Sequence, residues 1–289
     1  MAVKMTENSV GLFVGLTTLD FVYYADEYPD RNHKMKTQNY KRYLGGPAAN
    51  AAITYSLLGG KAVLISCLGK SAEAELMKKL LKEYNITVID CSDETELPTM
   101  ATIIVDSNGG RTIFSGQRLF AQTDISGLES YEADSGSNIG FCLFDLNQQE
   151  ISLDILKNIN SLSSEIVIDA GNWKPNTEAF IKNASVVIAS ETFKSPEGRN
   201  IFEIPEAAKA QKAITRGERD ILTENGSIPV ENVEAVDTLA AGDIFHGAFC
   251  YGYYNKGLDF DGALKFAAGI ASKSVKHYGP REWAKDCLR

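Results

Sequence analysis

The sequence lacks long apolar runs, and it carries fewer basic than acidic side chains. No apolar run approaches the roughly 18 residues that span a bilayer, and the N-terminal segment has no apolar core of the kind found in signal peptides. Asp and Glu number 38 against 29 Lys and Arg, a formal charge of −9, so the basic field that general nucleic-acid binding requires is missing. These absences predict a cytoplasmic protein with no membrane or nucleic-acid partner.

Cysteine and histidine are also scarce. The five cysteines include no Cys-x-x-Cys pair, and Cys67 and Cys142 lie inside apolar runs, so we expect reduced and mostly buried thiols. The three histidines show no metal-ligand spacing, and a zinc site is therefore not expected.

What the 289 residues do contain is an alternation of short apolar runs with helical patterns. Apolar runs of strand length recur from GLFVGL at residues 11–16 to DILTENG at residues 220–226. Helical patterns cover Ala48–Leu58, Glu73–Glu83, Ala241–Tyr254 and Asp261–Lys276. Alternating strands and helices predict a three-layer α/β/α domain, with a mainly parallel sheet covered on both faces.

Two stretches, at about residues 31–44 and 98–118, interrupt this alternation. In the second, ATIIVD and RTIFSG are joined by Ser-Asn-Gly-Gly, which predicts a hairpin. We interpret both stretches as a small β lid that projects from a single domain covering residues 1–289.

The strongest local signal is Asp237-Thr238-Leu239-Ala240-Ala241-Gly242-Asp243, between a strand-like run at residues 230–236 and a predicted helix. Small residues allow the backbone to approach a ligand closely, and the free N–H groups of a helix start form an anion hole. Asp243 would project to the same place and could take a proton from an attacking hydroxyl. From these residues alone, a simple helix cap explains the pattern equally well.

Two weaker signals lie near the N-terminus. Gly45-Gly46-Pro47 precedes a predicted helix whose first turn holds Asn50, an amide that could bond a ligand hydroxyl, although Gly-Gly-Pro is also an ordinary turn. Asp20 follows the first strand, and ligands of open α/β sheets bind at the carboxyl ends of strands. A lone Asp there can equally be a turn residue.

Together, these segments resemble the ribokinase-like (PfkB) carbohydrate kinases. Gly45-Gly46-x-x-x-Asn50, followed by Gly59 and Gly69, is similar to the family's N-terminal signature, and Asp237-Thr238-x-Ala-Ala-Gly-Asp243 to its C-terminal signature. Thr215-Arg216-Gly217 falls at the family's nucleotide-binding turn, and Asp20 at its early substrate aspartate. The resemblance covers nearly the whole chain, in order.

Within the family, the sequence looks most like the ketohexokinase and sulfofructose kinase branch. The similarity lies in the opening residues 15–24, in Gly110-Arg111-Thr112-Ile113 of the hairpin and in the helix start Asp243-Ile244-Phe245-His246-Gly247. Gly279-Pro280-Arg281 resembles a Gly-x-Arg that the bacterial members carry near the C-terminus.

The resemblance implies an enzyme that transfers the γ-phosphoryl group of ATP to a hydroxyl of a ketose or related small carbohydrate. Asp243 is then the general base, and the amides of Ala240, Ala241 and Gly242 hold the phosphoryl group. The residues assigned to the sugar are Asp20, Gly45, Gly46, Asn50 and Arg111. Those assigned to the nucleotide are Thr215, Gly217, Ala271 and Ser274. The resemblance further implies Mg²⁺ held through ATP and water, a potassium dependence in some members, and a homodimer that forms through the lids.

The sequence departs from the family in two places. Ala240 stands where a glycine is usual, and Ser190-Glu191-Thr192-Phe193 replaces the Asn-x-x-Glu motif that helps organise magnesium, which leaves Glu191 as the nearest acid and the metal ligands unknown.

Two other functions therefore stay open. One is a nucleoside kinase or a sugar-phosphate kinase, for which the basic residues around the lid are Lys34, Lys36, Lys41, Arg42 and Arg118. The other is a catalytically weak sugar or nucleotide sensor, against which the intact Asp243 argues.

Overall fold

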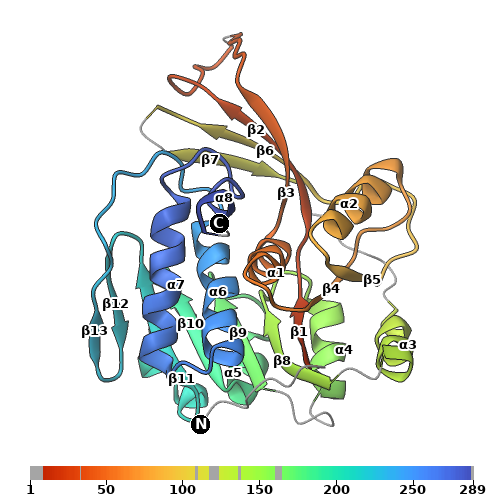
Figure 1. Ribbon diagram of the computed structural model, residues 1–289, viewed down its shortest axis with the longest axis vertical. Coiled ribbons are helices and arrows are strands. Elements are labelled where there is room, and N and C mark those ends of the chain that lie inside the picture. The colour runs from red at the N-terminus through yellow and green to blue at the C-terminus, as the bar shows by residue number, and fades with distance from the viewer. Residues whose placement is uncertain are drawn as a thin grey trace.

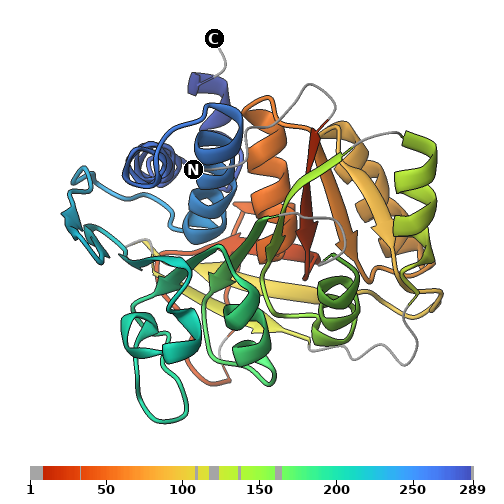
Figure 2. The same cartoon turned by 90° about the horizontal axis from the view of Figure 1, so that it is seen from below.

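A nine-stranded sheet with helices on both faces carries a second sheet of four strands across one end (Figures 1 and 2). This computed structural model describes residues 9–32, 34–107, 110–116, 124–135, 138–159 and 165–287. No helix within these ranges is long and apolar enough to cross a membrane.

The strand order of the large sheet is β13-β12-β11-β10-β9-β8-β1-β4-β5. Every neighbouring pair from β5 to β11 is parallel, whereas β12 and β13 pair antiparallel, so the predicted mainly parallel sheet is confirmed. Its strands are β1 (Ser9–Val14), β4 (Ala62–Ser66), β5 (Thr87–Asp90), β8 (Asn138–Phe144), β9 (Glu165–Ala170), β10 (Val186–Ser190), β11 (Gln211–Arg216), β12 (Arg219–Thr223) and β13 (Gly226–Ile228).

Helices cover both faces of this sheet, which is why its strands read as continuous apolar runs. Side chains alternate between faces: Phe13 of β1 packs in the core beneath α1, α2, α6 and α7, while Leu12 and Val14 pack in the core beneath α3, α4 and α5. The first layer comprises α1 (Pro47–Leu57), α2 (Ala72–Glu83), α6 (Ala241–Cys250), α7 (Phe260–Ser274) and the short α8 (Ala284–Cys287). The second comprises α3 (Ser126–Ser135), α4 (Gln149–Ile159) and α5 (Thr177–Asn183).

The helix predicted at residues 241–254 is α6, which continues into a π-helical turn at Tyr251–Asn255. It packs against α1 with almost no space between the backbones. A Cβ atom on Gly247 would lie 2.3 Å from the carbonyl oxygen of Ala51, so only glycine permits this approach. The consequence is that the starts of α1 and α6, far apart in the chain, lie next to each other.

The four-stranded sheet, called the lid sheet below, has the order β3-β2-β6-β7. Its strands are β2 (Thr18–Tyr24), β3 (Tyr40–Gly45), β6 (Met100–Val105) and β7 (Arg111–Ser115). The predicted hairpin is confirmed as β6 and β7. The sequence analysis missed β2, which begins only four residues after β1 ends. The strand-like interpretation of residues 230–236 is wrong: the structure has no strand there. Valine recurs at every third position, Val230, Val233 and Val236, which is not the alternation of a half-buried strand.

One face of the lid sheet packs on the end of the large sheet. Val22, Ile103 and Val105 are buried and cluster with Leu239, which precedes the start of α6. The described thiols are buried and outside any disulfide, as expected: Cys67, Cys91, Cys142 and Cys250.

Candidate active site

The starts of α1 and α6 bring together two side chains that are 193 positions apart. The side-chain amide of Asn50 donates a hydrogen bond to the Oδ2 atom of Asp243, with an N···O distance of 2.7 Å. Asp243 lies in the first turn of α6 and Asn50 in the first turn of α1. Residues from both sequence signatures therefore share one site.

At neutral pH, the carboxyl group of Asp243 is close to the midpoint of its protonation. Burial, and then the neighbouring Asp169, raise the pKa of Asp243 to about 7, whereas Asn50, His246 and Arg111 act to lower it. A carboxylate with its pKa near neutrality is suited to general-base catalysis. Asp169, in β9, did not stand out in the sequence analysis, although an acid near the end of an apolar strand run is a usable signal.

The backbone at the start of α6 has the geometry of a ligand-binding turn. Ala240 is the N-cap residue and adopts a left-handed conformation, with φ of 60°, and no side chain caps the helix. The carboxylate of Asp237 accepts instead from the amides of Leu239 (2.8 Å) and Gly279 (2.9 Å) and from the hydroxyl of Tyr24 (3.1 Å). The helix-cap explanation of this motif is therefore wrong: Asp237 ties the loop to the lid sheet and to the C-terminal segment.

The predicted anion-hole residues lie as expected at the first turn, but one amide is partly engaged. The amide of Ala241 points at the carbonyl oxygen of Thr238 at 3.3 Å. A Cβ atom on Gly242 would meet nothing within 4 Å, so open space lies in front of this turn. The N–H groups of a helix start have no intrahelical acceptor, and an anion in that space would receive them.

Asp20 lies on β2, on the buried face of the lid sheet. The hydroxyl of Thr18 donates to its Oδ1 atom at 2.5 Å. Burial raises the pKa of Asp20 to about 6, against the lowering effects of Thr18 and Arg281. A Cβ atom on Gly45 would lie 1.9 Å from the carboxylate of Asp20, so this glycine makes room for the side chain.

At position 46, glycine is required for a different reason. Its φ is +90°, and a Cβ atom there would lie 2.2 Å from the carbonyl oxygen of Leu16. The two glycines therefore set the entry into α1 and bring Asp20 close to it, whether or not they contact a ligand themselves.

A residue that the sequence analysis missed holds the start of α1 in place. The buried carboxylate of Asp145, directly after β8, accepts hydrogen bonds from the amides of Leu16 (2.8 Å), Ala48 (3.0 Å) and Asn147 (2.8 Å). Asp145 thus supplies the cap that α1 lacks from its own chain segment.

Arg281, which the sequence resemblance singled out without giving it a role, also contacts the start of α1. Its guanidinium donates to the carbonyl oxygen of Leu44 at 3.2 Å and to the Oδ1 atom of Asn50. It also lies 5.8 Å from the centre of the Tyr84 ring. The C-terminal segment therefore contacts both the end of β3 and the first turn of α1.

A cavity of about 640 Å³ adjoins the start of α6. Of the predicted nucleotide residues, Thr215, Gly217 and Ala271 line it, whereas the buried hydroxyl of Ser274 donates to the carbonyl oxygen of Ala271 at 2.8 Å. Its wall also includes Ala241 and Gly242, and its apolar lining is formed by Ile221, Val230, Val233, Ala235, Phe245, Ala268 and Val275. A phosphate at the helix start and a flat base against the apolar wall would both fit these surroundings.

Arg111 lies between the lid sheet and this cavity. Its guanidinium donates to the carbonyl oxygen of Thr238 and to the hydroxyl of Thr238, the latter at 3.1 Å, and it lines the same cavity as Thr215. From the sequence, Arg111 was expected to contact the sugar; in the structure it lines the same cavity as Thr215 and Gly217, next to the start of α6.

The described residues do not form a ready metal site. Glu191 pairs with Arg219 on the cavity wall, and no cluster of three or more His, Cys, Asp or Glu side chains that could hold a metal occurs within the described ranges. These surroundings fit a magnesium ion held mainly through phosphate oxygens and water. His246 is buried and its ring nitrogens lie 2.8 Å and 3.4 Å from the carbonyl oxygens of Gly242 and Ile188, which makes it part of the scaffold.

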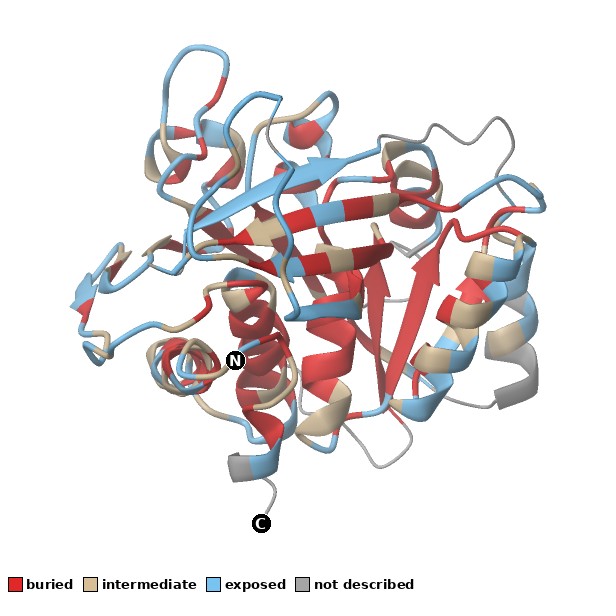
Figure 3. Ribbon diagram, turned by 90° about the horizontal axis from the view of Figure 1, so that it is seen from above, coloured by how far each residue is buried: buried red, intermediate tan, exposed pale blue. Residues whose placement is uncertain are grey.

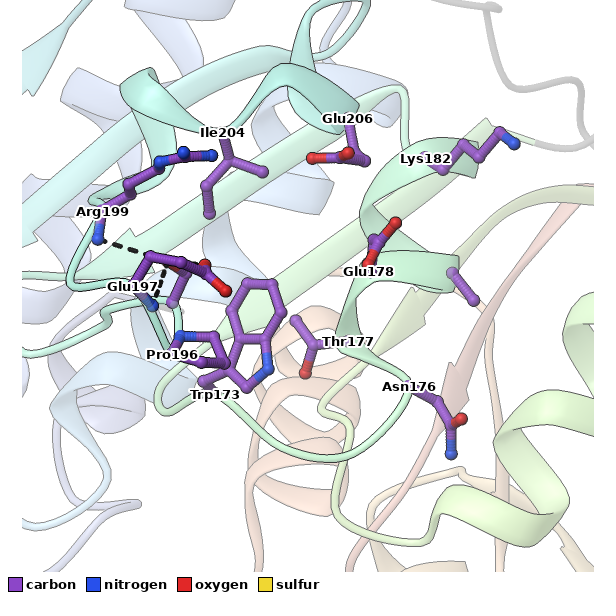
Figure 4. Close-up of a pocket in the computed structure, with 12 residues that line it drawn as sticks. Trp173, Asn176, Thr177, Glu178, Lys182, Pro196, Glu197, Arg199, Ile204 and Glu206 are labelled. Atoms are coloured by element: carbon purple, nitrogen blue, oxygen red, sulfur yellow. Dashed lines mark hydrogen bonds between the residues drawn. The ribbon is translucent and has the colours of Figure 1, made fainter.

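A second cavity, of about 800 Å³, opens at the surface beside α5 (Figure 4). Trp173, α5 and the segment around residues 195–206 line it. It contains none of the residues predicted for the site.

The chain belongs to the pfkB family of carbohydrate kinases, whose sequence profile matches residues 11–286. Similar proteins include the ribokinase of Dictyostelium discoideum, 27% identical, with 94% of this chain and 96% of that protein covered. Mouse ketohexokinase is 22% identical, with 91% and 94% covered. The Arabidopsis thaliana ribokinase, solved with ribose and ATP, superposes with a TM-score of 0.70 at 17% identity, covering 96% of this chain and 94% of that one. The protein is thus an ATP-dependent carbohydrate kinase with the ribokinase-like fold.

Proposed function

We propose that the protein phosphorylates a hydroxyl of a small, uncharged monosaccharide, with Asp243 as the general base. The observation that carries this is the hydrogen bond between Asn50 and Asp243, which joins the family's two signatures beside an open helix start. The ribokinase of Dictyostelium discoideum is 27% identical to this chain and mouse ketohexokinase is 22% identical, so a pentose is the first acceptor to test and a ketose the second.

In this scheme, Asp20 and Asn50 orient the sugar through its hydroxyl groups. Asp243 accepts the proton of the attacking hydroxyl, which its pKa near neutrality allows. Arg111 and the amides of Ala241 and Gly242 stabilise the charge that spreads over the transferring group. ATP supplies the phosphoryl group, and Thr215, Gly217 and Ala271 hold the nucleotide beside the apolar wall.

The other acceptors have less support. A sugar that already carries a phosphate would meet two carboxylates, Asp20 and Asp243, and like charges repel in a buried site. Lys34, Lys36, Lys41 and Arg42 are all exposed, and Arg118 lies outside the described residues. We therefore favour an acceptor without charge.

The test is ADP release with a panel of acceptors: ribose, ribulose, fructose, a ribose phosphate and nucleosides. Turnover with a free sugar supports the proposal. Preference for the nucleosides or for the sugar phosphate would assign the protein to one of the alternatives. Binding of sugar and ATP without turnover would make it a sensor.

We further propose that the protein forms a homodimer through the lid sheets. Tyr23 and Tyr40 are register partners on the face turned away from Asp20, with ring centres 6.1 Å apart, and Phe114 lies on the same face with 69% of its surface exposed. Every side chain of β7 is exposed (Figure 3). An apolar face at the edge of a small sheet favours pairing with another copy.

Sedimentation at micromolar concentration tests this assembly. We expect a dimer for the wild type and a shift to monomer for Phe114→Ser combined with Tyr40→Ser. A monomeric wild type would refute it.

A further inference from the structure

A short relay of side chains connects the C-terminal segment to the base. Arg281 donates to the Oδ1 atom of Asn50, and the Nδ2 atom of Asn50 donates to the Oδ2 atom of Asp243 at 2.7 Å. Arg281 also donates to the backbone carbonyl of Leu44, at the end of β3, at 3.2 Å. The guanidinium is therefore anchored on the backbone at one side and on the asparagine amide at the other.

The chemistry of the three groups fixes the direction of this relay. A guanidinium only donates and a carboxylate only accepts, whereas a carboxamide does one at each end. Arg281 thus requires the oxygen of Asn50 on its own side and leaves the NH₂ group for Asp243. Without Arg281, the amide could turn over and present its oxygen to the carboxylate, which would repel it.

The charge of Arg281 matters as well as its hydrogen bonds. Burial lowers the pKa of Arg281, while Tyr84, Asp243 and Asp20 act to raise it. The charged groups that face Asp243 from other elements are Asp169 of β9, which raises its pKa, and Arg111 of β7, which lowers it; His246, on α6 itself, also lowers it. Arg281 adds a partly buried cation that interacts electrostatically with both Asp20 and Asp243.

We propose that Arg281 is a positioning residue for phosphoryl transfer: by fixing the side-chain amide of Asn50, it holds the carboxylate of Asp243 in the orientation that receives the proton of the acceptor. This inference rests on the proposed function, because Asp243 is taken as the base. Arg281 itself needs no contact with the nucleotide.

The experiment compares Arg281→Gln and Arg281→Lys with wild type, using an accepted sugar between pH 5.5 and 9. For Arg281→Gln we expect kcat to fall at least about tenfold, since misplaced catalytic groups cost about this much or more, with the KM for ATP within about twofold. The acid limb of the kcat/KM profile should move to higher pH. Arg281→Lys should recover part of kcat, because it keeps the charge and one donor.

A double-mutant cycle separates this relay from a general structural role. Asn50→Ala removes the middle of the relay, so adding Arg281→Gln to it should cost much less than Arg281→Gln costs alone. Arg199→Gln, the same substitution beside the second cavity, is the matched control and should leave kcat and the pH profile unchanged. Additive effects, or a fall in kcat with an unmoved pH profile, would overturn the proposal.

A measurement that needs no sugar keeps the two proposals distinct. The ¹³C signal of the Asp243 carboxyl, assigned by its loss in Asp243→Asn, should titrate at higher pH in Arg281→Gln than in wild type. An unchanged midpoint overturns the role of Arg281 whatever the substrate is, whereas a wild type that phosphorylates none of the acceptors overturns the proposed function. If Arg281→Gln does not fold, Arg281→Lys and Asn50→Ala carry the same comparisons.

Discussion

The two cavities described above differ in what surrounds them more than in size. Each adjoins a helix start whose N-cap residue has a left-handed backbone: Ala240 before α6 for the cavity of about 640 Å³, and Asn176 before α5 for the cavity of about 800 Å³. Exposed charged side chains line both cavities, such as Glu191 in the first and Glu178 in the second. The first also has an extended apolar wall and lies beside Asp243, whose pKa is raised to about 7.

This difference indicates which of the two cavities is suited to catalysis. The smaller cavity lies where the parallel strands β10 and β11 end and α6 begins, so the backbone of Ala241 and Gly242 forms part of its wall, next to Asp243 in the same helical turn. The charged side chains that line both cavities are mostly exposed, and water screens their effects on a ligand, so the apolar wall and the neighbouring Asp243 set the smaller cavity apart. Matched substitutions in the two cavities can therefore test the assignment.

The largest effect is expected for Asp243→Asn. It keeps the shape of the side chain and a hydrogen-bond acceptor for Asn50, but removes the proton acceptor, so kcat should fall at least about a hundredfold. Sugar and nucleotide binding, followed by calorimetry, should persist within a few-fold. Glu178→Gln makes the same chemical change in the larger cavity and should leave kcat unaltered. If Asp243→Asn keeps most of its turnover, the base is misassigned; if it loses ligand binding, Asp243 is structural.

The next effect concerns Arg111. The guanidinium of Arg111 contacts Thr238 and lines the cavity beside α6. Arg111→Ala should therefore lower kcat/KM for ATP by about tenfold, which corresponds to the loss of one hydrogen bond between the charged guanidinium and ATP. Arg199→Ala is the control in the larger cavity. A rise in the KM of the sugar alone would return Arg111 to the sugar-binding role that the sequence suggested, and no effect on either substrate would make it a turn residue.

A smaller effect is expected in the dependence on pH. Asp243 must be ionised to act, so kcat/KM should rise with pH through about 7, its raised pKa, and level off above it. Asp243→Asn removes the pKa but also the base, so the rising limb should vanish from its residual activity. A profile that is flat between pH 5.5 and 8 would contradict this.

The same carboxyl should affect stability in the opposite direction. Its pKa is 3.8 unfolded and about 7 folded, so between those values the folded state binds more protons than the unfolded state. The contribution of Asp243 to stability is therefore greatest below pH 4 and is lost as the pH rises to about 7. The melting temperature of Asp243→Asn relative to wild type should rise from pH 5 to pH 8. A constant difference would show that burial does not raise the pKa of Asp243.

The smallest effect is expected for Ala240→Gly. Left-handed backbone costs a non-glycine residue about 1–2 kcal/mol, and glycine's greater freedom in the unfolded chain offsets part of the gain. We expect a rise in melting temperature of about 1–2 °C, with kcat within about twofold. A lower melting temperature would mean that the Ala240 methyl group contributes more packing than its conformation costs.

Much of the fold could be predicted because its signals are local. The runs around Leu12 and Ile188 are apolar throughout because both faces of the large sheet are covered, and a Gly-rich turn marks the β6–β7 hairpin. The small residues at 240–242 likewise indicated a helix start open to a ligand. The strand β2 was not predicted because it begins only four residues after β1 ends, too close for a separate strand to be expected.

The assembly of the site depended on the tertiary structure. Whether Asn50 meets Asp243 is decided by the close contact of α1 and α6 at Gly247, and the start of α1 is held by Asp145, 97 positions away from Ala48. Periodicity and motifs indicate which element a segment forms and which of its groups must find a partner. They do not report which distant segment meets that need, since hydrogen bonds such as that from Arg281 to Asn50 form only once packing has brought their partners together.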